Sequence, residues 1–192
     1  MLVAAGMAQA FVGDAAAISL TTEQRRQLSA GEIIVSVEPD QQGASARIKA
    51  AIEIAAPPDA VWAAMLDCKR SLKYVRGLVG CRVVSVDATG ASDVREHLVS
   101  WIALLPQVRS VFRSEYVRPQ SIKFQRVEGD IEVLEGAWQL EPMRAGTATR
   151  LHYNARVGKK TLVPGALIRA AIENDLPKTL GAMRQEVLRG AP

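Results

Sequence analysis

The stretch IKAAIEIAAPPDAVWAAMLD, Ile48–Asp67, decides the fold, because it joins an alternating strand directly to an amphipathic helix. Apolar residues alternate with Lys49 and Glu53 along its first part, the period-2 pattern of a half-buried strand. Pro57 and Pro58 then end the strand, since proline has no backbone N–H to donate to a ladder. The fixed φ of Pro58 suits the first turn of a helix. The stretch therefore predicts a strand that leads into a helix with almost no loop.

Further stretches follow this one in a regular order. They are YVRGLVGCRVV (74–84), EGAWQLEP (135–142), GTATRLHYNARV (146–157) and LVPGALIRAAIENDLPKTLGAMRQEVL (162–188). In order and spacing, the chain resembles the START-like (SRPBCC) helix-grip superfamily over roughly residues 47–188. That superfamily includes polyketide cyclase/dehydrase and coenzyme-Q-binding groups. The resemblance implies an α+β fold in which a curved antiparallel sheet wraps a long C-terminal helix and holds an apolar ligand. Some members catalyse reactions there, and many only bind.

The pattern along the rest of the chain agrees with such a sheet. Alternation and turn residues predict strands near 32–38, 81–86, 94–101, 109–117, 122–127, 134–141 and 149–157. Strands spaced this regularly, with no helices between them, indicate an antiparallel sheet. Short helices are predicted at 21–29, where Thr21 is the expected cap, and at 69–78.

The last predicted element is a long helix that opens at Pro164. Apolar residues recur along it at steps of three or four and form one stripe. Pro177 lies inside this helix and removes one hydrogen bond, so we expect a kink at 173–177.

Composition sets the class of protein. The 192 residues fit one helix-grip domain, 31–190, after a leader and short helix, 1–30. The net charge is +4, and the basic residues are spread among acidic ones and do not form a block. This pattern does not suggest a nucleic-acid site. No apolar run reaches the roughly 20 residues of a membrane span, so we expect no integral membrane segment.

Two features leave the cellular compartment open. Met1–Ala17 is rich in small and apolar residues, and Ala8-Gln9-Ala10 has the form of a signal-peptidase site, although no basic n-region precedes it. The segment is either the end of a signal peptide, with export slightly favoured, or a plain disordered leader. Cys68 and Cys81 are either a disulfide or two small core residues.

The chain shows little sign of catalytic machinery. His97 and His152 are expected to face solvent or a strand neighbour, and neither belongs to a metal motif or a Ser-His-Asp arrangement. The best catalytic candidate is Glu96, which would be a carboxylate of raised pKa if it pointed inward with Val94 and Leu98. No cofactor and no metal is predicted.

We therefore predict a protein that binds, and in one version transports, an apolar small molecule or lipid between the sheet and the last helix. The expected cavity wall consists of Trp62, Met65, Phe112, Tyr116, Trp138, Tyr153, Ile168, Ile172, Leu176 and Leu180. Its entrance is expected near 101–106 and 162–165, which could also touch a membrane surface transiently. Two alternatives remain: a cyclase/dehydrase-type enzyme, and a protein-interaction module without a ligand.

Overall fold

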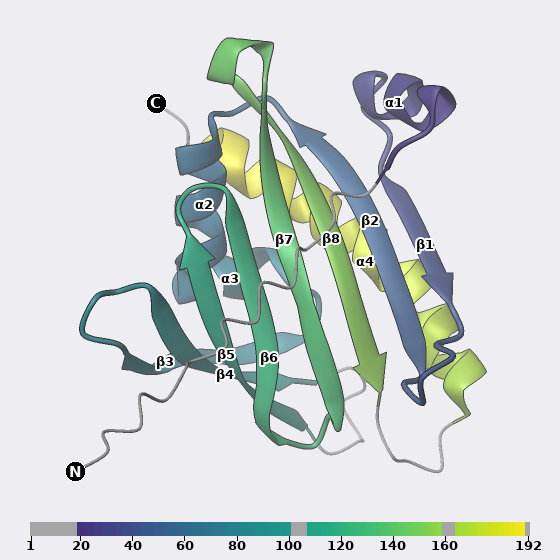
Figure 1. The fold of residues 1–192 in the computed structure, drawn as a ribbon, viewed down its shortest axis with the longest axis vertical. Coiled ribbons are helices and arrows are strands. Elements are labelled where there is room, and N and C mark those ends of the chain that lie inside the picture. The colour runs from purple at the N-terminus through teal and green to yellow at the C-terminus, as the bar shows by residue number, and fades with distance from the viewer. Residues whose placement is uncertain (1–18, 101–106, 159–163, 191–192) are drawn as a thin grey trace, which may run out of the picture.

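The computed structural model of this chain describes residues 19–100, 107–158 and 164–190 (Figure 1). In chain order the elements are α1 (Thr22–Ser29), β1 (Ile34–Glu38), β2 (Ala46–Ile54), α2 (Pro58–Leu66), α3 (Cys68–Tyr74), β3 (Leu78–Val86), β4 (Ser92–Val99), β5 (Val108–Val117), β6 (Ser121–Gly129), β7 (Val133–Met143), a short 3-10 turn, β8 (Ala148–Gly158) and α4 (Gly165–Arg189). All eight strands form one sheet, and α4 crosses one face of it.

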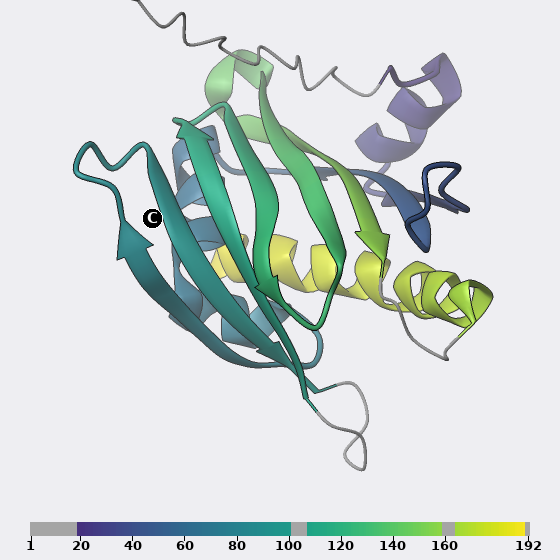
Figure 2. The ribbon, with the colours of Figure 1, turned by 60° about the horizontal axis from the view of Figure 1, so that its bottom comes forward.

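The sheet is a long meander closed by an N-terminal hairpin. The strand order is β1-β2-β8-β7-β6-β5-β4-β3, and every neighbouring pair is antiparallel. The register of β2 on β8 places Ile48 opposite Ala155 and Ile52 opposite Leu151. These residues are buried and share the face toward α4, which we call the inner face. The predicted α+β helix-grip fold, with a curved antiparallel sheet and a long C-terminal helix, is confirmed (Figure 2).

The joint between strand and helix forms as the sequence indicates. Pro57 is the N-cap of α2 and Pro58 its first residue. The carboxylate of Asp67 then accepts hydrogen bonds from the backbone N–H groups of Lys69 and Arg70, which starts α3 immediately after α2.

The predicted length of the second short helix was wrong. α3 ends at Tyr74, because Val75 is extended and Gly77 has φ +72°, a left-handed conformation that glycine adopts without strain. Leu78 already belongs to β3, so this strand begins three residues earlier than the pattern predicted.

The main core lies between the inner face and the C-terminal half of α4. Leu180, Met183 and Val187 are buried there against residues of β2, β8 and α2. α4 runs through Pro177 as one continuous helix, and the kink expected at that residue stays a prediction.

The outer face of the sheet carries a smaller core under α1. Leu28 packs there with Leu20, Ala51 and partly buried Ile34. A capping box fixes the start of α1, in which Thr21 and Gln24 bond to each other's backbone N–H groups.

Cys68 and Cys81 form a disulfide that ties the first residue of α3 to β3. This settles a pairing that the sequence left open. The two Cα atoms are 5.3 Å apart, within the usual range for a disulfide. No helix in the described part of the chain is both long and apolar enough to cross a bilayer.

Candidate functional site

The inner face of the sheet and the N-terminal half of α4 do not close on each other, and a cavity of about 380 Å³ lies between them. We call it the inner cavity. Figure 2 shows α4 lying along the concave side of the sheet. Most of the wall is apolar and comes from β4 to β8, α3 and α4. A cavity of this size and lining is typical of sites for small apolar ligands.

Most of the predicted wall residues line this cavity. They are Met65, Phe112, Tyr116, Trp138, Tyr153, Ile168, Ile172 and Leu176. They come from five elements far apart in the sequence, which the sheet order and the crossing of α4 bring together. Whether they contact a ligand stays a prediction.

Two predicted wall residues lie elsewhere. Trp62 is 3% exposed and Leu180 1% exposed, and both belong to the main core and do not line the inner cavity. The Trp62 ring meets the Tyr116 ring edge-on, with centroids 5.7 Å apart, so it supports the wall from behind. The helical stripe predicted which side of α4 is covered, but only the packing decided how far along it the cavity extends.

A run of aromatic rings forms one side of the cavity. The Trp138 and Tyr153 rings are stacked with centroids 4.1 Å apart, and Phe124 stacks on Tyr153 at 6.1 Å. Phe112 meets Phe124 edge-on at 6.3 Å. Burial raises the pKa of the Tyr153 hydroxyl, so this group is neutral at physiological pH.

A polar cluster that the sequence reasoning missed lies on β4 at the other side of the cavity. Arg95 lines the cavity, is 7% exposed and is ion-paired to Asp93 at 2.8 Å. Its guanidinium also donates to the backbone carbonyl of Leu66 at 2.8 Å. The available signal was the alternation of Asp93, Arg95 and His97, polar groups on one face of a strand.

Two atoms of this cluster lack a partner. The second carboxylate oxygen of Asp93, Oδ1, and the hydroxyl of Tyr116 are both buried without a hydrogen bond. Burial, and next the nearby Asp93 carboxylate, raise the pKa of Tyr116 to about 12. Buried polar groups are nearly always hydrogen-bonded, so an unpartnered pair beside a cavity marks where a ligand's polar atom could bind.

His97 also lines the inner cavity, where it contacts a residue of the neighbouring strand β5 and does not point to open solvent. Its ring meets the Phe112 ring edge-on, with centroids 4.9 Å apart. Burial, and then the positive charge of Arg95, lower the pKa of His97 to about 4. His97 is therefore a neutral imidazole at physiological pH. Ser110 and Ser114 of β5 add hydroxyl groups to the same wall.

The expectation for Glu96 must be corrected. Its side chain lies on the outer face, where it accepts hydrogen bonds from Arg82 and Arg109, both at 2.6 Å. These bonds lower the pKa of Glu96 to about 2, opposite to the raised value that catalysis would need. The alternation was recognised, but the partners on β3 and β5 decide which face is outer. Glu96 is a structural ion-pair residue.

One part of the cavity rim is polar and open. Arg76 follows α3 and Asp175 lies on α4; both line the cavity, and their side chains are 54% and 40% exposed. They form an ion pair at 3.1 Å, and Thr179 accepts a hydrogen bond from the Arg76 backbone N–H at 3.4 Å. The cavity thus reaches solvent between α3 and α4. The entrances predicted at 101–106 and 162–165 lie largely outside the described residues.

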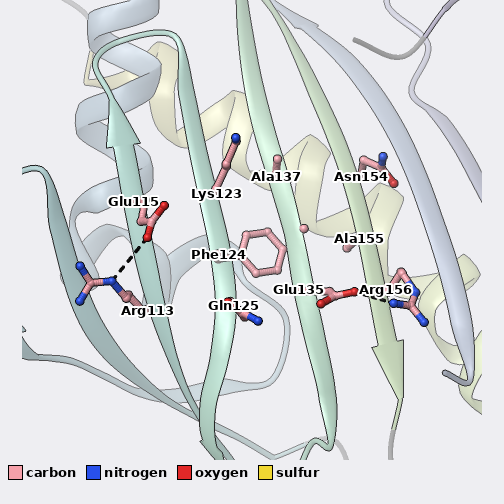
Figure 3. A pocket seen from close by; sticks show the side chains of 11 residues that line it. Arg113, Glu115, Lys123, Phe124, Gln125, Glu135, Ala137, Asn154, Ala155 and Arg156 are labelled. Atoms are coloured by element: carbon pink, nitrogen blue, oxygen red, sulfur yellow. Dashed lines mark hydrogen bonds and ion pairs between the residues drawn. The ribbon is translucent and has the colours of Figure 1, made fainter. Parts of the chain in front are cut away.

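A second hollow, of about 620 Å³, lies on the outer face across β5 to β8 (Figure 3). Its charged groups pair with one another, Arg113 with Glu115 at 3.6 Å and Arg156 with Glu135 at 2.6 Å. Most of its lining residues are charged or polar. We place the candidate ligand site in the inner cavity, because its wall is mostly apolar. Within the described ranges, no cluster of three or more metal-ligating side chains is present.

Residues 54–184 match the family described as polyketide cyclase / dehydrase and lipid transport. No curated protein matches the chain in sequence.

Several solved structures share the fold. A STAR-related lipid transfer protein from Xanthomonas axonopodis superposes with a TM-score of 0.67 at 15% identity, covering 81% of this chain and 93% of that one. The Zhui aromatase/cyclase from a Streptomyces species gives 0.62 at 15% identity, covering 76% and 98%. A protein from Thermus thermophilus gives 0.63 at 22% identity, covering 76% and 99%.

At these identities the structural matches establish the fold. The sequence match covers well over half of the chain, including the joint between β2 and α2, the polar cluster of β4 and most of α4. This chain belongs to the polyketide cyclase/dehydrase and lipid transport family.

Proposed function

We propose that this protein binds an uncharged, largely apolar small molecule that carries at least one hydroxyl or carbonyl group. The observation that supports the proposal most directly is the inner cavity, whose apolar wall includes one polar cluster with unpartnered atoms. Burial of ligand surface against the aromatic rings would supply affinity at about 25 cal/mol per Å². The polar cluster would fix the ligand's orientation.

The charge state of the cluster selects for a neutral ligand. Arg95 is already balanced by Asp93, while His97 and Tyr116 are uncharged at physiological pH. A carboxylate or phosphate placed here would be desolvated next to Asp93 without a free cation to pair with. A hydroxyl group, in contrast, can donate to Asp93 Oδ1 and accept from the Tyr116 hydroxyl.

The ligand can be identified directly. Protein purified from its native source is extracted with organic solvent, and the extract is analysed by mass spectrometry against Ala171→Trp. Ala171 lines the cavity, so the larger ring fills it. Ala170→Trp is the matched control, because Ala170 is exposed on the same helix. We expect one compound class in the parent and the control and none in Ala171→Trp. An empty extract, together with no saturable binding of several neutral lipid classes, would contradict ligand binding and favour the interaction module.

The role of the polar cluster is tested by titration. Tyr116→Phe removes one hydroxyl group with little change in shape. Asp93→Asn also keeps the shape, but it removes the charge that balances Arg95. They should weaken binding of a hydroxylated ligand by about twofold to tenfold, the usual worth of one hydrogen bond. Binding of the matching hydrocarbon should not change. Equal effects on both ligands would show that the cluster acts on the fold and not on the ligand.

A second candidate function is a proton-transfer enzyme of the cyclase/dehydrase type. The specific observation in its favour is a neutral imidazole, His97, beside hydroxyl groups of Ser110 and Tyr116 in the same cavity. Such an enzyme should exchange protons next to the carbonyl of a bound polyketone for deuterium. Mass spectrometry in D₂O detects this exchange, which His97→Phe should abolish. Binding without exchange supports the binding protein.

A further inference from the structure

We propose that α3 and the edge strand β3 form a docking surface for membranes that contain anionic lipids, with the rim of the inner cavity beside it. We call this the α3–β3 surface and define it by residues 68–86.

Charge is the first argument. The segment 68–86 contains five Lys and Arg residues and no Asp or Glu. The whole chain has 24 basic and 20 acidic residues, so the rest of the chain is balanced to within one charge. The basic residues are therefore less evenly spread than the composition suggested, although Asp67 and Asp87 flank the segment. Acidic partners from other elements neutralise it in part. Glu186 is shared by Arg70 and Lys73, Asp175 pairs with Arg76, and Glu96 pairs with Arg82 as well as with Arg109.

Exposed apolar side chains are the second argument. Nine large apolar side chains are exposed in the described part of the chain, and five of them belong to this surface: Leu72, Val79, Val83, Val84 and Val86, at 43–61% exposure. Exposed apolar residues that cluster in this way usually mark an interaction site. Interspersed with basic residues, they fit a bilayer, which offers both anionic head groups and an apolar layer.

The geometry makes one surface of the two elements. Along α3, Lys69, Leu72, Lys73 and then Arg76 are exposed at helical spacing. Val83 and Val86 pair with Arg95 and Asp93 of the polar cluster, so they face the side of the sheet on which α3 lies (Figure 1). Arg82 instead pairs with Glu96 on the outer face of β3. The Cys68–Cys81 disulfide holds α3 on β3. Because β3 is at the edge of the sheet, no further strand of the described chain covers it.

The surface also reaches the cavity. Val75 and Arg76, which directly follow α3, line the inner cavity, and the Arg76 side chain is more than half exposed. A bilayer against the α3–β3 surface would therefore lie beside the opening between α3 and α4, where an apolar molecule could pass without crossing bulk water.

Co-sedimentation with vesicles tests the proposal. The full-length protein is mixed with phosphatidylcholine vesicles with and without about one third phosphatidylglycerol. Each basic residue near an anionic surface contributes about 1 kcal/mol, or about fivefold in affinity. Lys69→Gln/Lys73→Gln should thus weaken binding to the anionic vesicles by about 25-fold. Leu72→Ser/Val79→Ser should weaken binding at high salt, because salt screens the charges and the apolar contribution then dominates.

Lys49→Gln/Arg118→Gln is the matched control, because it removes two exposed basic residues from other parts of the protein. It should bind within twofold of the parent. Equal loss in this control would show that total charge, not the α3–β3 surface, is responsible. Equal binding to neutral vesicles, no binding to any vesicle, or equal affinity for a short DNA duplex at the same salt would each overturn the proposal.

The vesicle experiment tests the docking surface separately from the proposed ligand binding. Titration of a neutral fluorescent ligand without vesicles reports on the inner cavity alone, and Lys69→Gln/Lys73→Gln should leave that affinity unchanged. Vesicle binding without ligand binding would reject the proposed function and keep the docking surface. Ligand binding without vesicle binding would do the reverse.

Discussion

Glu96 and His97 are neighbours on β4 whose side chains face opposite sides of the sheet, and their acid–base behaviour differs for that reason. Glu96 lies on the outer face between two guanidinium groups, so its charged form is stabilised. His97 lies in the inner cavity against Phe112 and near Arg95, so its charged form is disfavoured. At physiological pH, the Glu96 carboxylate is therefore ionised and the adjacent His97 imidazole is neutral, because their side chains lie on opposite faces of the strand.

The low pKa of Glu96 predicts a pH-dependent contribution to stability. Its pKa is about 2 in the folded protein, against an ordinary value of 4.5 in the unfolded chain. The unfolded chain therefore binds more protons between these values, and the stabilisation is full above pH 4.5 and lost as the pH falls towards 2. Urea unfolding of Glu96→Gln should show lower stability than the parent at neutral pH and little difference near pH 2. The control Glu132→Gln, an exposed carboxylate, should follow the parent. A difference that does not change with pH would contradict this account.

The low pKa of His97 can be measured directly. In a proton NMR titration, the ring resonance of His97 should shift near pH 4, and His152→Gln identifies which of the two histidine signals it is. Phe112→Ala removes the ring that covers the imidazole and should move the pKa of His97 towards 6.5. A parent value near 6.5 would mean that the cavity is hydrated and that His97 is an ordinary surface-like group.

At the scale of the element, β7 shows how one missing side chain shapes the cavity wall. Gly136 pairs with Phe124 on β6 and with Ala155 on β8. A Cβ at this position would lie 2.8 Å from the tip of the Phe124 ring and from the Ala155 Cα atom, and would meet the Asn154 carbonyl oxygen. The Phe124 ring therefore occupies the space that a side chain on β7 would need, and it continues the aromatic wall to Tyr153.

Gly136→Ala should destabilise the protein by about 1–3 kcal/mol, the usual cost of overpacking, because backbone atoms cannot move aside. Gly181→Ala is a control for which the free energy of unfolding should change in the opposite direction. Its Cβ would have ordinary contact with Ile33 at 3.5 Å, and alanine in the middle of α4 should stabilise by about 0.5–1 kcal/mol. Chemical denaturation measures both. An unchanged midpoint in Gly136→Ala would show that β7 and β8 can separate at this point and that the Phe124 ring can move.

At the scale of the whole molecule, the two halves of the structure are held differently. The C-terminal half of α4 packs into the main core through Leu180, Met183 and Val187. The N-terminal half instead borders the inner cavity and has fewer buried residues. α3 bridges the two regions, since Tyr74 lies in the core while Arg76 is on the cavity rim.

The Cys68–Cys81 disulfide should contribute to global stability through the unfolded state. It joins two residues that are 13 positions apart, and for a loop of this size the chain-entropy stabilisation is about 3 kcal/mol. Cys68→Ser/Cys81→Ser should lose about this much in urea unfolding, and a reductant should lower the parent to the same level without affecting the variant. Thiol labelling shows when the disulfide of the parent protein is fully reduced. If the stability of the parent in urea does not change after full reduction, the disulfide makes no such contribution.

The local elements could be predicted from sequence because their signals are local. The alternation of β2, the prolines that join it to α2 and the stripe of α4 depend only on the period of each element and on the missing N–H of proline. The same patterns predicted eight of the ten proposed wall residues at positions that line the inner cavity.

Tertiary structure decided the rest, because it depends on pairing between distant strands. Glu96 binds Arg82 of β3 and Arg109 of β5, which are 14 and 13 residues away in the sequence, and these ion pairs lie on the outer face. Because Glu96 lies on the outer face of β4, its neighbours Arg95 and His97 lie on the inner face and line the cavity. The packing of α4 places Trp62 and Leu180 in the main core. A strand's period shows that it has two faces. Only its neighbours decide which of them is inside.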